Sequence, residues 1–247
     1  MSRSWVILKR TGRLLKFLLL CVVLSICIFL LWRVFSTGIP NDLKTFIPND
    51  SLSIAYDKQG QDLYMFRQNL DIITRAEHNK GYFAVPESVF IPDANQAQIV
   101  FRYNNSTITS VASDYSLDSV PSRDKELFDV TLVLYVDLTP DIKEDNYSTT
   151  DENVRAIRVK PSAKKSAQSQ LYNFYRYLFD FSNAEEDINL SELLESGTLI
   201  AVHAQVYYKD DLDYSKAPYG AICLYASTST NKEVKWSAAN KKYFEED

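Results

Sequence analysis

Cysteine and glycine are scarce in this sequence. The 247 residues include three cysteines and six glycines. Cys21 and Cys27 lie in a long apolar run, so the rest of the chain holds only Cys223 and cannot form an internal disulfide. There is no glycine-rich phosphate loop, no His-Glu-x-x-His zinc motif and no Gly-x-Ser-x-Gly nucleophile motif. These absences exclude a disulfide-stapled scaffold and several common enzyme classes.

Positive charge is scarce outside the N-terminal segment. Residues 1–36 carry six Lys and Arg and no acid, so residues 37–247 carry the other 21 of the 27 basic residues and all 32 acidic ones. Their net charge is therefore about −11. Binding to nucleic acid needs clustered cations, so we expect no nucleic-acid partner. The same charge predicts repulsion from an anionic membrane surface.

A long apolar run is the most informative feature that is present. The chain from residue 17 to residue 32 contains no charge, proline or glycine. A helix needs about 20 apolar residues to cross a bilayer, and residues 14–36 reach that length if Lys16 and Arg33 extend their charges to the interfaces. Trp32 suits the interface as well. The sequence therefore predicts a transmembrane helix over residues 14–36, which would be the contact with lipid.

The distribution of basic residues predicts the orientation of this helix. Five of the six cations in residues 1–36 precede the apolar run, and basic flanks remain in the cytoplasm. We expect residues 1–13 to form a cytoplasmic tail and the C-terminal part to be extracytoplasmic, in a single-pass membrane protein. Cleavage after Ser36 is an open alternative. An uncleaved signal anchor is favoured because the run is longer than a usual signal-peptide core.

The remainder of the chain reads as a linker followed by one domain. Residues 37–50 contain two prolines and two Asn-Asp pairs, which are typical of turns, and we interpret them as a linker. Residues 51–247 are enough for one extracytoplasmic domain with a substantial core. We expect strands at 51–56, 82–85, 98–103, 129–138, 154–159, 171–181, 198–208, 220–226 and 233–236, and a helical turn at 190–195 after Asn189.

Strands separated by turn-rich loops indicate the fold class. Residues 129–138 alternate apolar side chains on both faces, which predicts a central strand. Residues 61–77 fit either a helix or two strands, and we favour strands. Long helices do not alternate with the strands, so the fold predicted is mainly β: an N-terminal transmembrane helix followed by an antiparallel β-sandwich of the immunoglobulin or fibronectin kind.

Four segments prompt a family resemblance. They are Tyr82-Phe-Ala-Val-Pro-Glu87, Phe101-Arg-Tyr-Asn-Asn-Ser106, the stretch from Phe128 to Pro140, and Pro218-Tyr-Gly-Ala221. With the single apolar run, the chain resembles uncharacterised single-pass membrane-anchored proteins of Gram-positive bacteria. The resemblance implies a location in the cell envelope and a β fold, and it implies no activity.

Cys223 and His203 form one candidate catalytic pair. A membrane-anchored β protein with one cysteine and an upstream histidine is similar in architecture to sortases, which are cysteine transpeptidases. Their nucleophile is preceded by threonine and followed by an arginine, whereas Ile222 precedes Cys223 and no arginine follows it. A cysteine in an apolar strand is more often a core residue, so we expect no catalytic residues, and a Cys223/His203 transpeptidase-like enzyme is the alternative.

The cluster of aspartates and the many tyrosines each have a structural and a functional interpretation. Asp210, Asp211 and Asp213 offer hard oxygen ligands for a cation, but their spacing matches no calcium motif, so we expect a solvated acidic loop and no metal. All 16 tyrosines follow the apolar run. Most are expected in the core, and a carbohydrate-binding module that uses exposed rings is the alternative. No motif predicts a cofactor.

These observations favour binding over catalysis. We expect a membrane-anchored extracytoplasmic β-sandwich that is a non-enzymatic protein-binding or scaffolding component of the cell envelope, with a protein partner in that envelope. Sheet edges or loops would make the contact.

Overall fold

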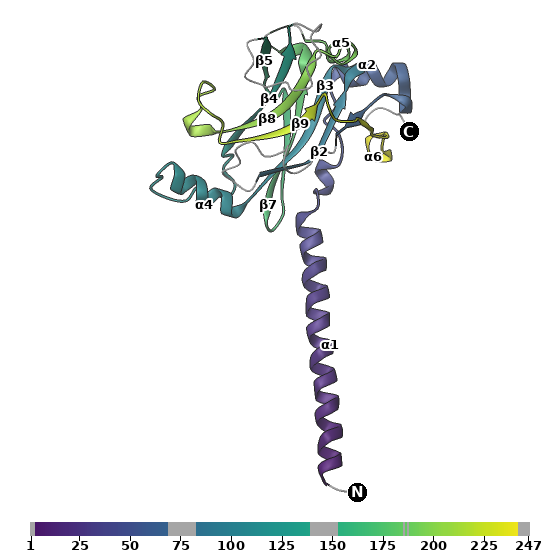
Figure 1. The fold of residues 1–247 in the computed structure, drawn as a ribbon, viewed down its shortest axis with the longest axis vertical. Helices are drawn as coiled ribbons and strands as arrows, with labels where there is room; N and C mark the ends of the chain where they lie inside the picture. The colour runs from purple at the N-terminus through teal and green to yellow at the C-terminus, as the bar shows by residue number, and fades with distance from the viewer. Residues whose placement is uncertain (1–2, 69–82, 139–152, 185, 187, 242–247) are drawn as a thin grey trace.

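A single long helix projects as a stalk from a β-rich domain (Figure 1). The computed structural model describes residues 3–68, 83–138, 153–184, 186 and 188–241. The stalk is α1 (Arg3–Thr37), and its part from Leu15 to Arg33 is long and apolar enough to cross a membrane. None of the residues in the apolar window of this part is buried. The predicted apolar N-terminal helix is confirmed.

The domain is mainly β, as predicted, and contains two antiparallel sheets. The first sheet has the strand order β10-β1-β2-β3-β7-β6, and the second has the order β5-β4-β8-β9. The strands are β1 (Phe66–Arg67), β2 (Phe83–Ile91), β3 (Gln96–Asn104), β4 (Phe128–Asp137), β5 (Val154–Val159), β6 (Ala163–Gln168), β7 (Tyr172–Asp180), β8 (Leu199–Tyr208), β9 (Gly220–Ala226) and β10 (Lys232–Glu233).

One hydrophobic core lies between the two sheets. Alternate residues of β4, such as Leu132 and Leu134, are fully buried in it, as period-2 alternation requires. Aromatic rings join the sheets: the ring centroid of Phe128 lies 4.9 Å from that of Phe83 and 5.0 Å from that of Tyr103. Each fully buried aromatic side chain contributes about 1.5–3 kcal/mol through removal of its apolar surface from water.

Helices and the N-terminal segment cover the outer face of the first sheet. Leu52 and Ala55 of α2 pack with Val89 and Ile91 of β2. The helices of the domain are α2 (Asp50–Gln59), α4 (Asn105–Asp114), α5 (Leu190–Glu195) and α6 (Ala238–Lys241), with a 3-10 turn η1 at Asn41–Leu43. The predicted turn at 190–195 is α5, and the Asn189 side chain accepts a hydrogen bond from the backbone N–H of Glu192, as a helix cap does.

Residues 37–50 are part of the domain, which corrects the linker predicted there. Leu43 is 0% exposed and packs with Val100 and Phe174 of the first sheet. The Gln98 side chain donates to the carbonyl of Ile47 and accepts from its N–H, at 2.9 and 2.8 Å. Prolines and Asn-Asp pairs therefore shape turns on the domain surface here, and they do not form a free spacer.

Residues 51–56 are helical, which corrects the strand predicted there. Asn49 caps α2, because its side chain accepts a hydrogen bond from the Leu52 N–H at 3.0 Å. Leu52, Ala55 and Tyr56 are buried at helical spacing, whereas Ile54 is 55% exposed. The apparent alternation at residues 52, 54 and 56 was therefore misleading, since only two of these residues face the protein.

Several further elements differ from the prediction: the helix α4 was not predicted, and the strand expected at 233–236 is the shorter β10. The strand expected at 82–85 continues to Ile91, because the pairing of β2 with β3 shifts its register between Ala84 and Glu87 and so accommodates Pro86. β6 was not predicted. Of the ambiguous segment 61–77, the structure shows a turn and the short strand β1, and residues 69–77 lie outside the described residues.

Candidate functional site

The outer face of the second sheet carries the candidate pair Cys223 and His203. On β8, Val202 and Ala204 point into the shared core, and strand alternation turns His203, Gln205 and Tyr207 to the opposite face. A sheet face that points away from the core normally meets solvent or another surface. This face is therefore where a functional site can form.

The structure brings the predicted pair Cys223 and His203 together. His203 of β8 lies directly opposite Cys223 of β9 in the strand register. Val133 of β4 lies opposite His203 on the other side, and Arg158 of β5 lies opposite Val133. These four residues form one row across the sheet, which sequence alone does not reveal.

The geometry of this row differs from that of an accessible nucleophile. Cys223 is 8% exposed and His203 is 6% exposed. The Cys223 thiol donates to the Tyr225 carbonyl, with an Sγ to oxygen distance of 3.2 Å. Arg158 lies three strands from Cys223, or about 14 Å at the usual strand spacing, which is too far to stabilise an oxyanion there. The arrangement supports the interpretation of Cys223 as a packed strand residue.

Alkylation of Cys223 tests this burial. In the full chain with Cys21→Ala and Cys27→Ala, we expect a maleimide to label Cys223 slowly in the native state, on the order of a hundredfold more slowly than after denaturation, because labelling requires local opening. Mass spectrometry of the labelled chain over time measures both rates. Equal native and denatured rates would show an accessible thiol and revive the enzyme alternative.

The best-defined cluster on this face surrounds Arg158. Its Nη2 donates to Gln205 Oε1 at 3.1 Å and to Tyr207 Oη at 3.0 Å. The guanidinium carbon lies 4.6 Å from the ring centroid of Tyr214 and 5.4 Å from that of Tyr207. Lys160 Nζ lies 5.2 Å from the Tyr214 ring. We call Arg158, Gln205, Tyr207 and Tyr214 the Arg158 cluster.

The electrostatics of the Arg158 cluster suit binding. Tyr214 Oη donates to Asp129 Oδ2 at 2.6 Å. Burial and this bond to a carboxylate raise the pKa of Tyr214, and burial raises the pKa of Tyr207 although Arg158 opposes the shift. Both phenols are therefore neutral at physiological pH, and an arginine remains charged. The cluster presents a fixed cation between two rings and has no group poised for proton transfer near pH 7.

The three aspartates of the predicted acidic loop each have a partner, and Lys216 pairs with both Asp211 and Asp213. Asp210 accepts from Lys125 at 2.5 Å and from Tyr208 at 3.0 Å, and these bonds lower its pKa. Asp211 pairs with Lys216 at 3.4 Å. Asp213 accepts from the backbone N–H and the hydroxyl of Ser215, which lowers its pKa. Within the described part of the chain, no group of three or more His, Cys, Asp or Glu is arranged to hold a metal ion.

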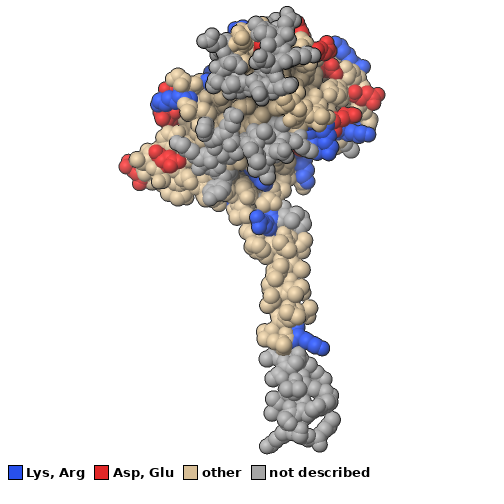
Figure 2. Space-filling view, viewed as in Figure 1, with Lys and Arg blue, Asp and Glu red and all other residues tan. Residues whose placement is uncertain are grey.

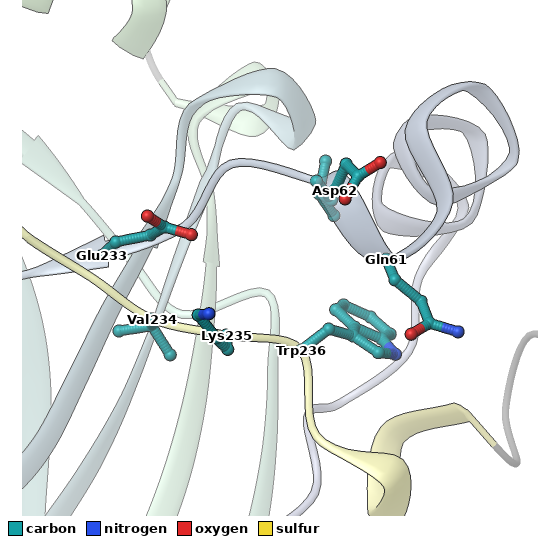
Figure 3. Close-up of a pocket in the computed structure, with 7 residues that line it drawn as sticks. Gln61, Asp62, Glu233, Val234, Lys235 and Trp236 are labelled. Carbon is teal, nitrogen blue, oxygen red and sulfur yellow. The ribbon is translucent and has the colours of Figure 1, made fainter.

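A cleft of about 290 Å³ lies between the turn after α2 and the C-terminal segment (Figure 3). Gln61 and Asp62 line one side, and Glu233, Lys235 and Trp236 line the other. The side chains do not converge: the Trp236 ring lies near Gln61, and Glu233 lies at the far end (Figure 3). This cleft lacks the focused polar groups of a small-molecule site.

No protein-family model, curated protein or solved structure matches this chain.

Most tyrosines in the described part of the chain are buried. Tyr103, Tyr175 and Tyr177 stack in sequence inside the core, with neighbouring centroids 6.0 Å apart. A sugar-binding platform needs exposed coplanar rings, so these three cannot supply one. The residues that sequence reasoning missed are those of the Arg158 cluster, and the only signal for them is the pair of arginines Arg155 and Arg158 in a strand at the sheet edge.

Buried tyrosines predict loss of stability at alkaline pH. Burial and the bond to Asp210 raise the pKa of Tyr208 to about 12. An unfolded tyrosine titrates near pH 10, so the folded state holds this proton more tightly. The resulting stability is present below about pH 10 and is lost as the pH rises towards 12. Melting temperatures from about pH 8 to about pH 11 should fall, and Tyr208→Phe should make the fall less steep. An unchanged slope in Tyr208→Phe would contradict the assignment.

Proposed function

We propose that this chain is a single-pass membrane protein that holds a non-enzymatic, protein-binding domain at the outer surface of the cell membrane. The apolar stretch of α1 supports the anchor, and the excess of basic residues before it supports a cytoplasmic N-terminus. The partner is a protein of the cell envelope. The Arg158 cluster is the proposed centre of the contact.

Continuity between α1 and the domain supports a retained anchor. α1 continues to Thr37, whose hydroxyl donates to the Arg33 carbonyl at 2.9 Å. Ile39 already packs against the domain with Leu43. The alternative cleavage point after Ser36 falls inside this helix and next to the packed segment, so a protease would have to unwind the helix to reach it.

The strand order supports an immunoglobulin-like sandwich. In that fold, strands A, B, E and D form one sheet, and strands C, F and G form the other, to which variable domains add C′ beside C. The order β2-β3-β7-β6 corresponds to A-B-E-D, and β5-β4-β8-β9 corresponds to C′-C-F-G, when the strands are lettered in chain order. The neighbouring pairs are antiparallel, as in the immunoglobulin fold. The short strands β1 and β10 extend the first sheet beyond β2.

The Arg158 cluster is the observation that carries the binding proposal. Arginine and tyrosine are enriched at the energetic centres of protein interfaces, because they offer large, preorganised amphipathic surfaces. Hydrogen bonds from Arg158 to Gln205 and Tyr207 hold its guanidinium in place before any partner arrives. A partner with a carboxylate or an aromatic ring at this point would meet a preorganised cation and the half-buried ring of Tyr214. Tyr207 is 4% exposed, so its part is to hold Arg158 in place.

Site-specific crosslinking in intact cells tests the proposal. A photo-crosslinking amino acid in place of Lys160, which is exposed beside Tyr214, should give a discrete adduct with an envelope protein. The same amino acid in place of Lys58, an exposed residue of α2, is the matched control. Arg158→Ala should weaken the adduct about thirtyfold, the factor for loss of an interface centre. Adducts from residue 58 alone would contradict the proposal.

A further inference from the structure

The base of the domain, where α1 joins it, is basic although the domain as a whole is acidic. Arg33 ends the apolar stretch of α1, and Lys44 is exposed directly after η1. Lys and Arg atoms are visible where the domain meets the stalk, and acidic atoms are visible at the outer flanks (Figure 2). We call Arg33, Lys44 and Arg102 the basic collar, because Arg33 and Lys44 flank the junction of α1 with the domain along the chain and Arg102 contacts the end of α1.

Contacts with the end of α1 fix the collar in place. Arg102 Nη1 donates to the Thr37 carbonyl, and its guanidinium lies 4.6 Å from the centroid of the Tyr172 ring. Trp32 Nε1 donates to Gln170 Oε1 at 2.6 Å, so the turn between β6 and β7 touches the anchor. The base therefore has a defined position relative to the membrane-spanning stretch.

This position places the base at the headgroup layer. The polar layer adds about 5–7 Å to each side of the hydrocarbon core. The helix rises about 6 Å over the four steps from Arg33 to Thr37. The domain then begins at Ile39 without a spacer, so residues after Thr37 start at the outer limit of the lipid headgroups.

A cleft opens at this level. It has a volume of about 380 Å³, and its lining residues are Gly38, Ile39, Pro40, Asn41, Lys44, Gln168 and Ser169. Lys44 is its only charged lining residue. The nearby acids are Asp42, which is exposed in η1, and Asp124, which accepts from Gln168 at 3.2 Å.

Ionic screening limits which charges of the domain contribute to the electrostatic potential at its base. The Debye length is about 8 Å at physiological ionic strength, so remote exposed acids contribute little at the base. Among the described residues at the base, the three cations of the collar and Arg123, which donates to the Ser169 carbonyl, outnumber the acids Asp42 and Asp124. Local attraction to a phosphate therefore prevails over the repulsion that the total charge of the domain predicts.

We propose that the cleft beside the basic collar binds the phosphate of an anionic phospholipid headgroup, with Lys44 as its main contact. This inference rests on the proposed insertion of α1 in the membrane. The lipid would hold the base against the bilayer and fix the direction in which the Arg158 cluster points.

Lipid retention tests the inference. The full chain is purified in detergent micelles with equal amounts of phosphatidylglycerol and phosphatidylcholine, and native mass spectrometry counts the lipids that remain bound. The unchanged chain should retain phosphatidylglycerol preferentially. Lys44→Gln should lower this preference about fivefold, the factor for one basic residue near a membrane surface. Lys58→Gln, which removes an exposed lysine of α2, should leave it unchanged.

The outcomes separate the two proposals. Equal retention by Lys44→Gln and the unchanged chain would overturn the lipid site and leave the anchor intact. Displacement of the lipid by added inorganic phosphate would overturn it as well, since the site would then belong to a free anion. Failure of the full chain to co-purify with phospholipid vesicles would instead overturn membrane insertion itself.

Discussion

Glu87→Leu is expected to lower the free energy of unfolding by about 3 kcal/mol, because it leaves a buried arginine without its counter-charge. Arg176 lies on β7, its side chain is 0% exposed, and its Nη2 bonds to Glu87. Burial lowers the pKa of Arg176, and Glu87 opposes that shift. The Glu87 side chain is 28% exposed, so we expect the lower end of the range for broken buried pairs. Urea unfolding of the full chain in micelles, followed by near-ultraviolet circular dichroism, measures the loss.

A second variant separates the charge from the packing. Glu87→Leu with Arg176→Met removes both charges and keeps apolar volume, so the double variant should be destabilised by at least about 1 kcal/mol less than the sum of the two single variants. Strict additivity of the two substitutions would show that the pair is not coupled. It would also contradict the assignment of Arg176 as a buried cation that depends on Glu87.

Arg176 also links the first sheet to the N-terminal segment. Its Nε donates to the Leu43 carbonyl at 2.7 Å, and its guanidinium carbon lies 5.4 Å from the centroid of the Phe46 ring. The same side chain therefore contacts Glu87 on β2 and the segment that leads to the anchor. Loss of this arginine should loosen the connection between the domain and α1 as well as the sheet.

The sequence predicts those elements whose signal is local. The apolar alternation of residues 129–138 and 198–208 gives β4 and β8 almost residue for residue. A strand that is buried on one or both faces of a sheet needs this pattern of apolar residues, so the pattern is a reliable local signal for a strand. The apolar run of α1 is also a local signal, because its length and composition match those that a helix needs to cross a bilayer.

Helix caps were the local signal that the prediction underused. Asn49 and Asn104 each begin a helix, and the Asn104 side chain accepts from the Thr107 N–H at 3.0 Å. Asn49 was interpreted as a turn residue, because the same side chain serves turns and caps, and the helix α4 after Asn104 was not predicted. The apolar side chains of residues 51–56 alternate by chance. The buried contacts of Leu52 and Ala55 show that one helical face packs against the sheet.

The candidate site depends on contacts that are distant in sequence. Arg158 and Tyr214 are 56 residues apart, and Cys223 reaches His203 only through the register of β8 and β9. Strand order and register are set by the whole sheet, so a single sequence does not reveal which residues of distant strands are neighbours. The sequence could therefore identify Cys223 and His203 as a candidate pair, but it could not predict that they lie in one row with Arg158.

Leu43→Ala gives the other large expected effect, a loss of about 3 kcal/mol in the free energy of unfolding. Leu43 is 0% exposed between the N-terminal segment and the sheet residues Val100 and Phe174. Truncation removes its apolar surface and leaves a cavity that the backbone bonds of η1 keep from collapsing. The same urea unfolding of the full chain measures the change.

Ile54→Ala is the matched control, because Ile54 is an aliphatic residue of the same region that is 55% exposed. Its substitution should change stability by less than about 0.5 kcal/mol. If residues 37–50 were a spacer, both substitutions would be equally mild. A large effect at Leu43 alone would show that the chain which directly follows α1 is already part of the folded domain. Packing would then set the position of the Arg158 cluster relative to α1. The proposed lipid contact at the base requires such a rigid connection.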